Sequence, residues 1–230
     1  MEYTINIKGC LMDLSTPQVM GILNVTPDSF YSGSRKQTEM EIAQRANQII
    51  KEGGSIIDVG AFSTRPGADE VSEEEEGRRL KFALDIVRRE QPDAAVSVDT
   101  YRPTLARKCI EEWGADIIND VSEGGITGIT NVPLEQRQEE YPEMFRVVGE
   151  LKVPYILMSV QPTLETMMKG FAKEVQQLRD LGAKDIILDP DSDLPLVNIK
   201  TRLIGDDGAW TQLVVPCRGH IVYIDAEVMG

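Results

Sequence analysis

The feature that most constrains the fold is an alternation of short apolar segments with segments whose apolar residues recur at helical spacing. The apolar runs are short and continuous, as in strands that are buried on both faces of a parallel sheet. They cover residues 18–23, 56–59, 95–98, 116–119, 155–158 and 185–188. Helical spacing fills the intervals, at 38–51, from 72 onward, at 102–113, in a segment ending near 151, and at 163–181. The alternation predicts an α/β fold with a parallel sheet.

A (β/α)8 barrel of the TIM type explains this alternation better than an open doubly wound sheet. Polar residues end successive strands, and no glycine-rich dinucleotide fingerprint follows any strand. Tyr3–Thr16 alternates apolar and polar residues around Lys8-Gly9, which predicts a β-hairpin before the barrel.

The rhythm fails after Asp189. Apolar clusters recur at 194–197, 213–215 and 221–224, without a helical segment between them. The last two units are therefore predicted to be either shortened or closed by irregular strands. We expect one barrel domain over 1–230, with 1–17 as its hairpin and 191–230 as a divergent segment.

Composition limits the functions that such a barrel can have. A net charge of −14 over 230 residues would repel a nucleic-acid backbone. Cys10, Cys109 and Cys217 are odd in number and far apart, and His220 is the only histidine, which argues against disulfides, zinc and a multi-histidine metal centre. The first residues, Met1-Glu-Tyr-Thr4, show no basic start or apolar core, so we do not expect a signal peptide, and no apolar run approaches a membrane span. We predict a cytoplasmic protein without nucleic-acid or membrane partners.

Two helical features have ordinary structural readings. The acidic run Glu73–Glu76 follows Ser72 at a helix start, so we expect it to face solvent and to complement the helix dipole. Cys109 lies on an apolar helix face and is expected to be packed and inert.

Polar residues collect where the predicted strands end, which is where the loops of a barrel build active sites. Each alone could be a turn or a helix cap. Together, in register, they favour a binding site, and the residues are Asn24, Asp58, Asp99, Asn119, Met158-Ser159 and Asp189.

The segments around these strand ends resemble the signature stretches of the dihydropteroate synthase family. After the first two strands they read Met20-Gly-Ile-Leu-Asn-Val-Thr-Pro-Asp-Ser-Phe30 and Asp58-Val-Gly-Ala-Phe-Ser-Thr-Arg-Pro-Gly-Ala68. Ser97-Val-Asp-Thr100, Ile117-Ile-Asn-Asp-Val121, Tyr155-Ile-Leu-Met158 and Asp185-Ile-Ile-Leu-Asp-Pro190 are similar to the four strands that follow. The resemblance extends from about residue 18 to 190.

The resemblance implies an enzyme that joins a pterin diphosphate to p-aminobenzoate, giving dihydropteroate and diphosphate for folate biosynthesis. It implies that the pterin is held by Asp99, Asn119 and Asp189, with Met158 against its ring and Asp58 also in contact with substrate. Carboxylates and an amide suit the N–H donors of a 2-amino-4-oxopterin. The implied catalytic residues are Asp99, Arg65 and Asp189.

For the diphosphate group, the resemblance implies Mg²⁺ as a cofactor, with Asn24 as its protein ligand. Thr64 and Arg65 would contact the diphosphate and the p-aminobenzoate, and Phe30 and Pro66 would be apolar walls. The end of the chain offers Arg218 and His220, which are similar to the family's final Arg-x-His and would meet the diphosphate. The resemblance also implies a homodimer.

The match departs from the family in its late segments. Ser159 stands where the family has histidine, Asp191-Ser-Asp-Leu-Pro195 replaces a glycine-rich loop, and the seventh-strand Ser-Arg-Lys motif is not visible, with Lys200-Thr-Arg202 as the nearest basic cluster. Three functions therefore remain open: an active synthase, a pterin-binding or interaction protein without catalysis, and a folate-binding methyltransferase domain. The Thr-Arg-Pro-Gly loop favours the synthase side over the methyltransferase.

Overall fold

The computed structural model describes residues 4–25, 35–62, 71–125, 141–161 and 163–190, and beyond them the strand backbones at 203–204, 210–211, 213–217 and 220–224. Its first element is the hairpin of β1 (Thr4–Ile7) and β2 (Cys10–Asp13), which pair antiparallel with Ile7 opposite Cys10. Lys8 and Gly9 both have positive φ, at 50° and 86°. Two such residues make the tight turn that matches the twist of a hairpin, so the predicted hairpin is confirmed.

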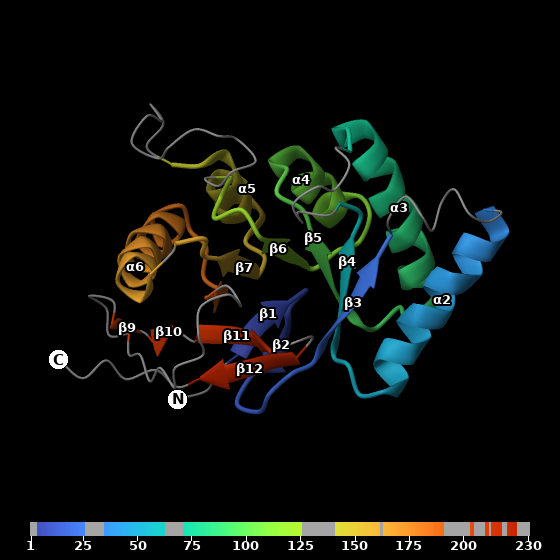
Figure 1. Ribbon diagram of the computed structural model, residues 1–230, viewed down its shortest axis with the longest axis horizontal. Helices are drawn as coiled ribbons and strands as arrows, with labels where there is room; N and C mark the ends of the chain where they lie inside the picture. The colour runs from blue at the N-terminus through green and yellow to red at the C-terminus, as the bar shows by residue number, and fades with distance from the viewer. Residues whose placement is uncertain are drawn as a thin grey trace.

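Six parallel strands follow, and the helices between them lie around the outside of the sheet (Figure 1). The strands are β3 (Met20–Asn24), β4 (Ile56–Gly60), β5 (Ala95–Asp99), β6 (Ile117–Asp120), β7 (Tyr155–Met158) and β8 (Ile186–Asp189). The helices are α2 (Arg35–Lys51), α3 (Glu73–Glu90), α4 (Pro103–Glu111), α5 (Glu143–Leu151) and α6 (Leu164–Asp180). Each predicted strand and helix is present, with ends that differ by a few residues.

The sheet ends in a hairpin where two further strand–helix units were in question. β11 (Leu213–Cys217) runs parallel to β8, and β12 (His220–Ile224) returns antiparallel to β11. β9 (Leu203–Ile204) and β10 (Trp210–Thr211) form a separate small pair. β12 lies beside β3, so the two edge strands of the eight-stranded sheet are neighbours. The fold is a TIM-type α/β barrel with irregular closing strands, and the described part of the chain after Asp189 contains no helix.

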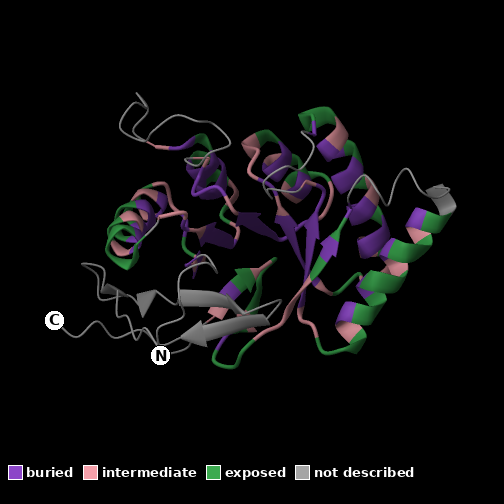
Figure 2. Ribbon diagram, in the orientation of Figure 1, coloured by how far each residue is buried: buried purple, intermediate pink, exposed green. Residues whose placement is uncertain are grey.

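Alternate residues of the strands face two different cores. Outward residues such as Val59, Val98 and Leu157 pack against the helices, and β4 to β7 are buried along most of their length (Figure 2). Inward residues at the start of the strands, including Ile56, Ile117 and Ile187, pack against the hairpin. The hairpin covers this end, so among the described residues we expect a ligand site at the other end of the barrel.

An ion pair fixes the hairpin under the barrel. Nζ of Lys8, in the hairpin turn, lies 2.6 Å from Oδ1 of the buried Asp116. Arg88, at the end of α3, binds the other carboxylate oxygen of Asp116. The acid just before β6 is thus held from both sides.

The start of α3 corrects one expectation. Ser72 caps the helix by accepting a hydrogen bond from the backbone N–H of Glu75, as predicted. Glu76, however, is fully buried instead of facing solvent. Its carboxylate accepts hydrogen bonds from Oγ1 of Thr100 at 2.7 Å and from Nε of Arg102 at 2.8 Å. None of the helices described is long and apolar enough to cross a membrane.

Candidate active site at the carboxyl end of the barrel

The strand register brings the predicted polar residues together on the inner face of the barrel. Asn24 is paired with Gly60, Gly60 with Asp99, and Asp99 with Asn119. One level deeper, Asp58 is paired with Ser97. Residues that are paired across parallel strands point to the same face, so four strands contribute polar groups to one surface.

A hydrogen bond across the barrel connects two of these groups. Nδ2 of Asn119, on β6, donates to Oδ2 of Asp58, on β4, at 3.1 Å, although β5 lies between their strands. Both side chains are buried. The bond leaves Oδ1 of Asp58 buried without a hydrogen bond of normal geometry, and the same holds for Oγ of Ser97 beside it. Such groups are costly unless a ligand or water satisfies them.

Gly60 allows two further side chains to converge at the mouth. A Cβ atom built on Gly60 would lie 3.0 Å from Oδ1 of Asn24 and 3.3 Å from Oδ2 of Asp99. Only a residue without a side chain leaves both oxygens in this position. The site therefore depends on a glycine that the residue-type argument did not single out.

Mutual repulsion and burial govern the charge of the acids. Burial, followed by the charges of Asp58, Asp120 and Glu76, raises the pKa of Asp99 well above its usual range. Burial also raises the pKa of Asp58, which its contacts with Ser97 and Asn119 offset only in part. None of the inward-facing residues on β3 to β8 is a lysine or arginine. A ligand that brings N–H donors or positive charge would relieve both penalties.

The far wall of the site comes from β7 and β8. Met158 is paired with Asp189, and the backbone N–H of Ser159 donates to the carbonyl of Asp189 at 2.8 Å. Ser159 is buried, and its Oγ accepts a hydrogen bond from the backbone N–H of Gln161 at 3.2 Å.

The oxygen atoms at the mouth could supply only part of the coordination shell of Mg²⁺. Asn24 and Asp99 offer two oxygen atoms over Gly60, and the described residues contain no cluster of three or more acidic, cysteine or histidine ligands. Mg²⁺ retains waters and takes substrate phosphates as ligands more readily than it enters an all-protein cage. The pair fits an ion whose remaining ligands come from a bound diphosphate and water.

Several predicted site residues lie outside the described part of the chain. These are Phe30, Thr64, Arg65, Pro66 and Arg218, and only the backbone of His220 is described, at the start of β12. The structure thus brings together Asn24, Asp58, Asp99, Asn119, Met158 and Asp189.

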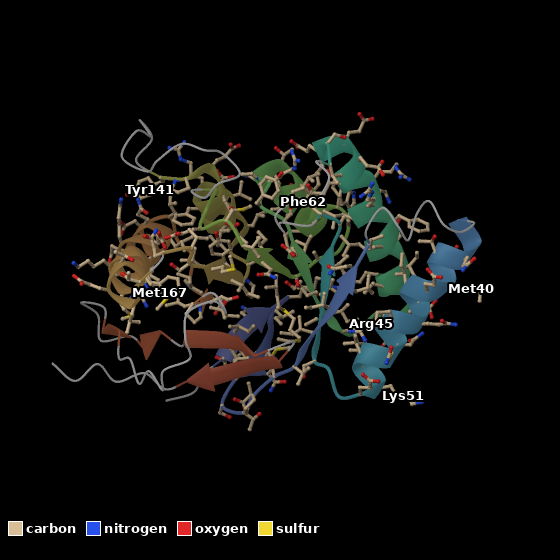
Figure 3. All side chains as sticks on the ribbon, viewed as in Figure 1. Met40, Arg45, Lys51, Phe62, Tyr141 and Met167 are labelled. Carbon is tan, nitrogen blue, oxygen red and sulfur yellow. The ribbon has the colours of Figure 1, made fainter. Side chains whose placement is uncertain are left out.

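The turn after β5 contains residues that sequence reasoning missed. The ring of Tyr101 meets that of Phe62 edge-on at 5.3 Å between centroids, and Phe62 lies beyond the carboxyl end of β4 (Figure 3). Arg102 lies over the ring of Tyr101 and donates through Nη2 to the carbonyl of Val71 at 2.7 Å. The signal available in the sequence was the adjacency of an aromatic residue and an arginine directly after the strand-end acid.

Comparisons with known proteins agree with this geometry. The profile described as "Pterin binding enzyme" matches residues 20–193. A mitochondrial folate synthesis bifunctional protein of Arabidopsis thaliana is 35% identical over 90% of this chain and 33% of its own length. The dihydropteroate synthase of Escherichia coli is 38% identical over 71% of this chain and 52% of its own length. The chain thus spans between a third and about half of the length of these relatives.

Solved structures show the same relationship. The dihydropteroate synthase of Xanthomonas albilineans, solved with 4-aminobenzoic acid, is 27% identical and superimposes with a TM-score of 0.69, covering 86% of this chain and 70% of that one. Because the profile covers most of the chain, including every described residue at the barrel mouth, the chain belongs to the pterin-binding enzyme family.

Proposed function

We propose that the protein is a dihydropteroate synthase, which condenses 7,8-dihydropterin-6-ylmethyl diphosphate with p-aminobenzoate to give dihydropteroate and diphosphate. The observation that carries the proposal is the buried pair of Asp58 and Asn119 at the closed floor of the mouth. The Asp58 carboxylate, with the neighbouring Ser97 hydroxyl, suits the N–H edge of a pterin. The relatives named dihydropteroate synthase support the same reaction.

The residues of this chain would act by binding and by charge stabilisation. Asp58, Asn119 and Asp189 orient the pterin ring, with Met158 as an apolar contact. As the bond to diphosphate breaks, positive charge develops on the pterin, and a nearby positive charge favours the ionised form of Asp99. Asp99 then stabilises that charge until the arylamine nitrogen attacks the methylene carbon and releases a proton.

We also propose Mg²⁺ as the cofactor, held by Asn24 with Asp99 nearby, and Arg65 with Thr64 as the contacts to diphosphate and p-aminobenzoate. Bound Mg²⁺ would neutralise charge on the leaving diphosphate. The homodimer stays a proposal, and the exposed thiol of Cys10 suits a reducing compartment such as the cytoplasm.

Calorimetric titration with the pterin diphosphate and Mg²⁺, followed by addition of p-aminobenzoate and assay of dihydropteroate, tests the proposal. Asp58→Asn should weaken pterin binding about tenfold to a hundredfold, the scale of one hydrogen bond to a charged group. Asp85→Asn on the exposed face of α3, where the acid pairs with Lys81, is the matched control and should leave binding unchanged. Wild-type protein that binds no pterin would sink the proposal.

A second candidate is a pterin-binding protein without catalysis. The absence of lysine and arginine from the inward-facing residues of β3 to β8 favours it, because a diphosphate then needs cations from elsewhere. If the protein binds the pterin diphosphate but forms no dihydropteroate after p-aminobenzoate is added, this second candidate is supported.

A further inference from the structure

A buried glutamate occupies a backbone conformation that normally belongs to glycine. Glu123, in the loop after β6, has φ of 53° and is fully buried, and Gly124 and Gly125 after it also have positive φ. Side chains other than glycine seldom adopt this region. A strained backbone persists where surrounding contacts determine it, so the contacts of this carboxylate are informative.

The Glu123 carboxylate ties the loop after β6 to the loop after β7. Its Oε2 accepts from the backbone N–H of Val160 at 3.1 Å, and Nε2 of Gln161 donates to both oxygens at 3.1 and 3.2 Å. Val160 and Gln161 come just after Met158, the last residue of β7, and Ser159. One side chain therefore sets where the backbone leaves β7.

A second buried acid meets Glu123 from α6. The Glu174 side chain is buried and shares a hydrogen bond with that of Glu123. Gly170, one turn earlier, leaves the space for both, because a Cβ atom there would lie 3.3 Å from Oε1 of Glu123 and 3.6 Å from Oε1 of Glu174. Two carboxyl groups in contact away from water cannot both be ionised at low cost.

We propose that Glu123 and Glu174 hold one proton between them, and that this carboxyl–carboxylate pair positions the Ser159–Gln161 segment at the mouth of the barrel. Glu123 accepts hydrogen bonds from two groups of that segment, which suits its ionised form, so the proton resides on Glu174. The consequence for substrate rests on the proposed function, because the positioned segment adjoins the wall expected to contact the pterin.

The electrostatic surroundings agree with one shared proton. Burial, and then the hydrogen bond and charge of Glu123, raise the pKa of Glu174 to about 9, while Lys173 lowers it and Asp120 raises it further. Tyr155, whose hydroxyl donates to Asp120 at 2.6 Å, is a further titratable group in this network. Since the folded form keeps a proton that the unfolded chain releases near pH 4.5, the pair stabilises the fold at low pH, and this contribution is lost as pH rises to about 9.

Carboxyl ¹³C resonances, followed by NMR between pH 5 and 10 without ligand, test the shared proton. Glu174 is expected to titrate near pH 9, and the amide resonance of Val160 to shift with the same midpoint. In Glu174→Gln the side-chain amide still donates to Glu123 but cannot titrate, so the Val160 amide should stop responding in this range. Glu165→Gln, at the exposed start of the same helix, should leave the midpoint unchanged. A Glu174 carboxyl that is already ionised at pH 7, or a Val160 amide that responds identically in wild type and Glu174→Gln, would overturn the proposal.

Pterin titration at pH 7 tests the consequence for substrate. Glu123→Gly suits the left-handed backbone but removes the anchor, and pterin affinity should fall roughly tenfold, as for the loss of a charge-assisted hydrogen bond. An unchanged affinity with intact wild-type binding would overturn the positioning role. If the wild-type protein binds no pterin, the proposed function fails, while the carboxyl and amide titrations still decide the shared proton and the anchoring.

Discussion

At the residue scale, the site depends on a position that has no side chain, Gly60. Gly60 stands on β4 where Asn24 and Asp99 approach from the two neighbouring strands. Gly60→Ala would place a methyl group against both oxygens, so we expect kcat/KM for dihydropteroate formation to fall about tenfold or more, because small misplacements of positioned groups carry large kinetic effects. Steady-state kinetics with both substrates measures this.

A second glycine supplies the control for this substitution. Gly77 in α3 also leaves no free space, since a Cβ atom would lie 2.9 Å from Cδ2 of Leu105, but that atom is the flexible end of a side chain on α4, outside the barrel strands. Gly77→Ala should keep wild-type kinetics. Equal rates for Gly60→Ala and wild type would mean that Asn24 and Asp99 need not converge for activity.

The same residues mark what sequence could and could not predict. Asp58, Asp99, Asn119 and Asp189 were predictable because acids and amides at the ends of apolar strands have no packing role. Ser97 and Glu123 were not, because their importance comes from the register of β4 with β5 and from a loop that bends back on its neighbour. Such contacts depend on tertiary structure and leave no local pattern.

At the element scale, the turn after β5 holds both ends of the segment 63–70. Tyr101 packs on Phe62 before that segment, and Arg102 binds the carbonyl of Val71 after it. Arg102→Lys keeps a positive charge beside the buried Glu76 but lacks the planar fork that reaches both groups. Because Arg65 is proposed to act from this segment, we expect KM for p-aminobenzoate to rise several-fold, roughly the effect of one hydrogen bond, with pterin affinity unchanged.

The matched control lies on the next helix. Arg107 is on the outer face of α4, where it pairs with Glu111 and Glu150 at the surface. Arg107→Lys should change neither KM for p-aminobenzoate nor pterin affinity, because exposed ion pairs contribute little to stability. A similar KM for Arg102→Lys and wild type would show that the two ends of the segment are held by other contacts.

The elements themselves were largely predictable up to Asp189, since strand and helix periodicities are strong there. Glu76 was misassigned because an acidic run at a helix start usually faces solvent, although its spacing of four residues from Leu80 places it on the buried face of α3. After Asp189 the chain has apolar clusters without helical spacing, so the closing hairpin of β11 and β12 could not be derived from periodicity.

At the scale of the whole molecule, the barrel separates stability from binding by using its two ends differently. The hairpin closes the amino-terminal end with apolar contacts and the Lys8–Asp116 pair, while the acids gather at the opposite end. The net charge of the protein is −14, which repels an anionic substrate. A diphosphate must therefore be held by a few local groups at the mouth.

Removing apolar volume from the hairpin should therefore lower stability without altering the site. Ile5 is buried against the inward residues of the barrel, and Ile5→Ala should cost about 2–4 kcal/mol of unfolding free energy. For a chain of this size the loss corresponds to a fall in Tm of very roughly 5–15 °C. Leu11→Ala, on the same hairpin but 68% exposed, should change stability by no more than about 0.5 kcal/mol. Thermal unfolding followed by pterin titration well below Tm distinguishes the two effects. If folded Ile5→Ala binds pterin more weakly, the two ends of the barrel are coupled, and if Leu11→Ala is equally destabilising, the hairpin buries a different face from the one described.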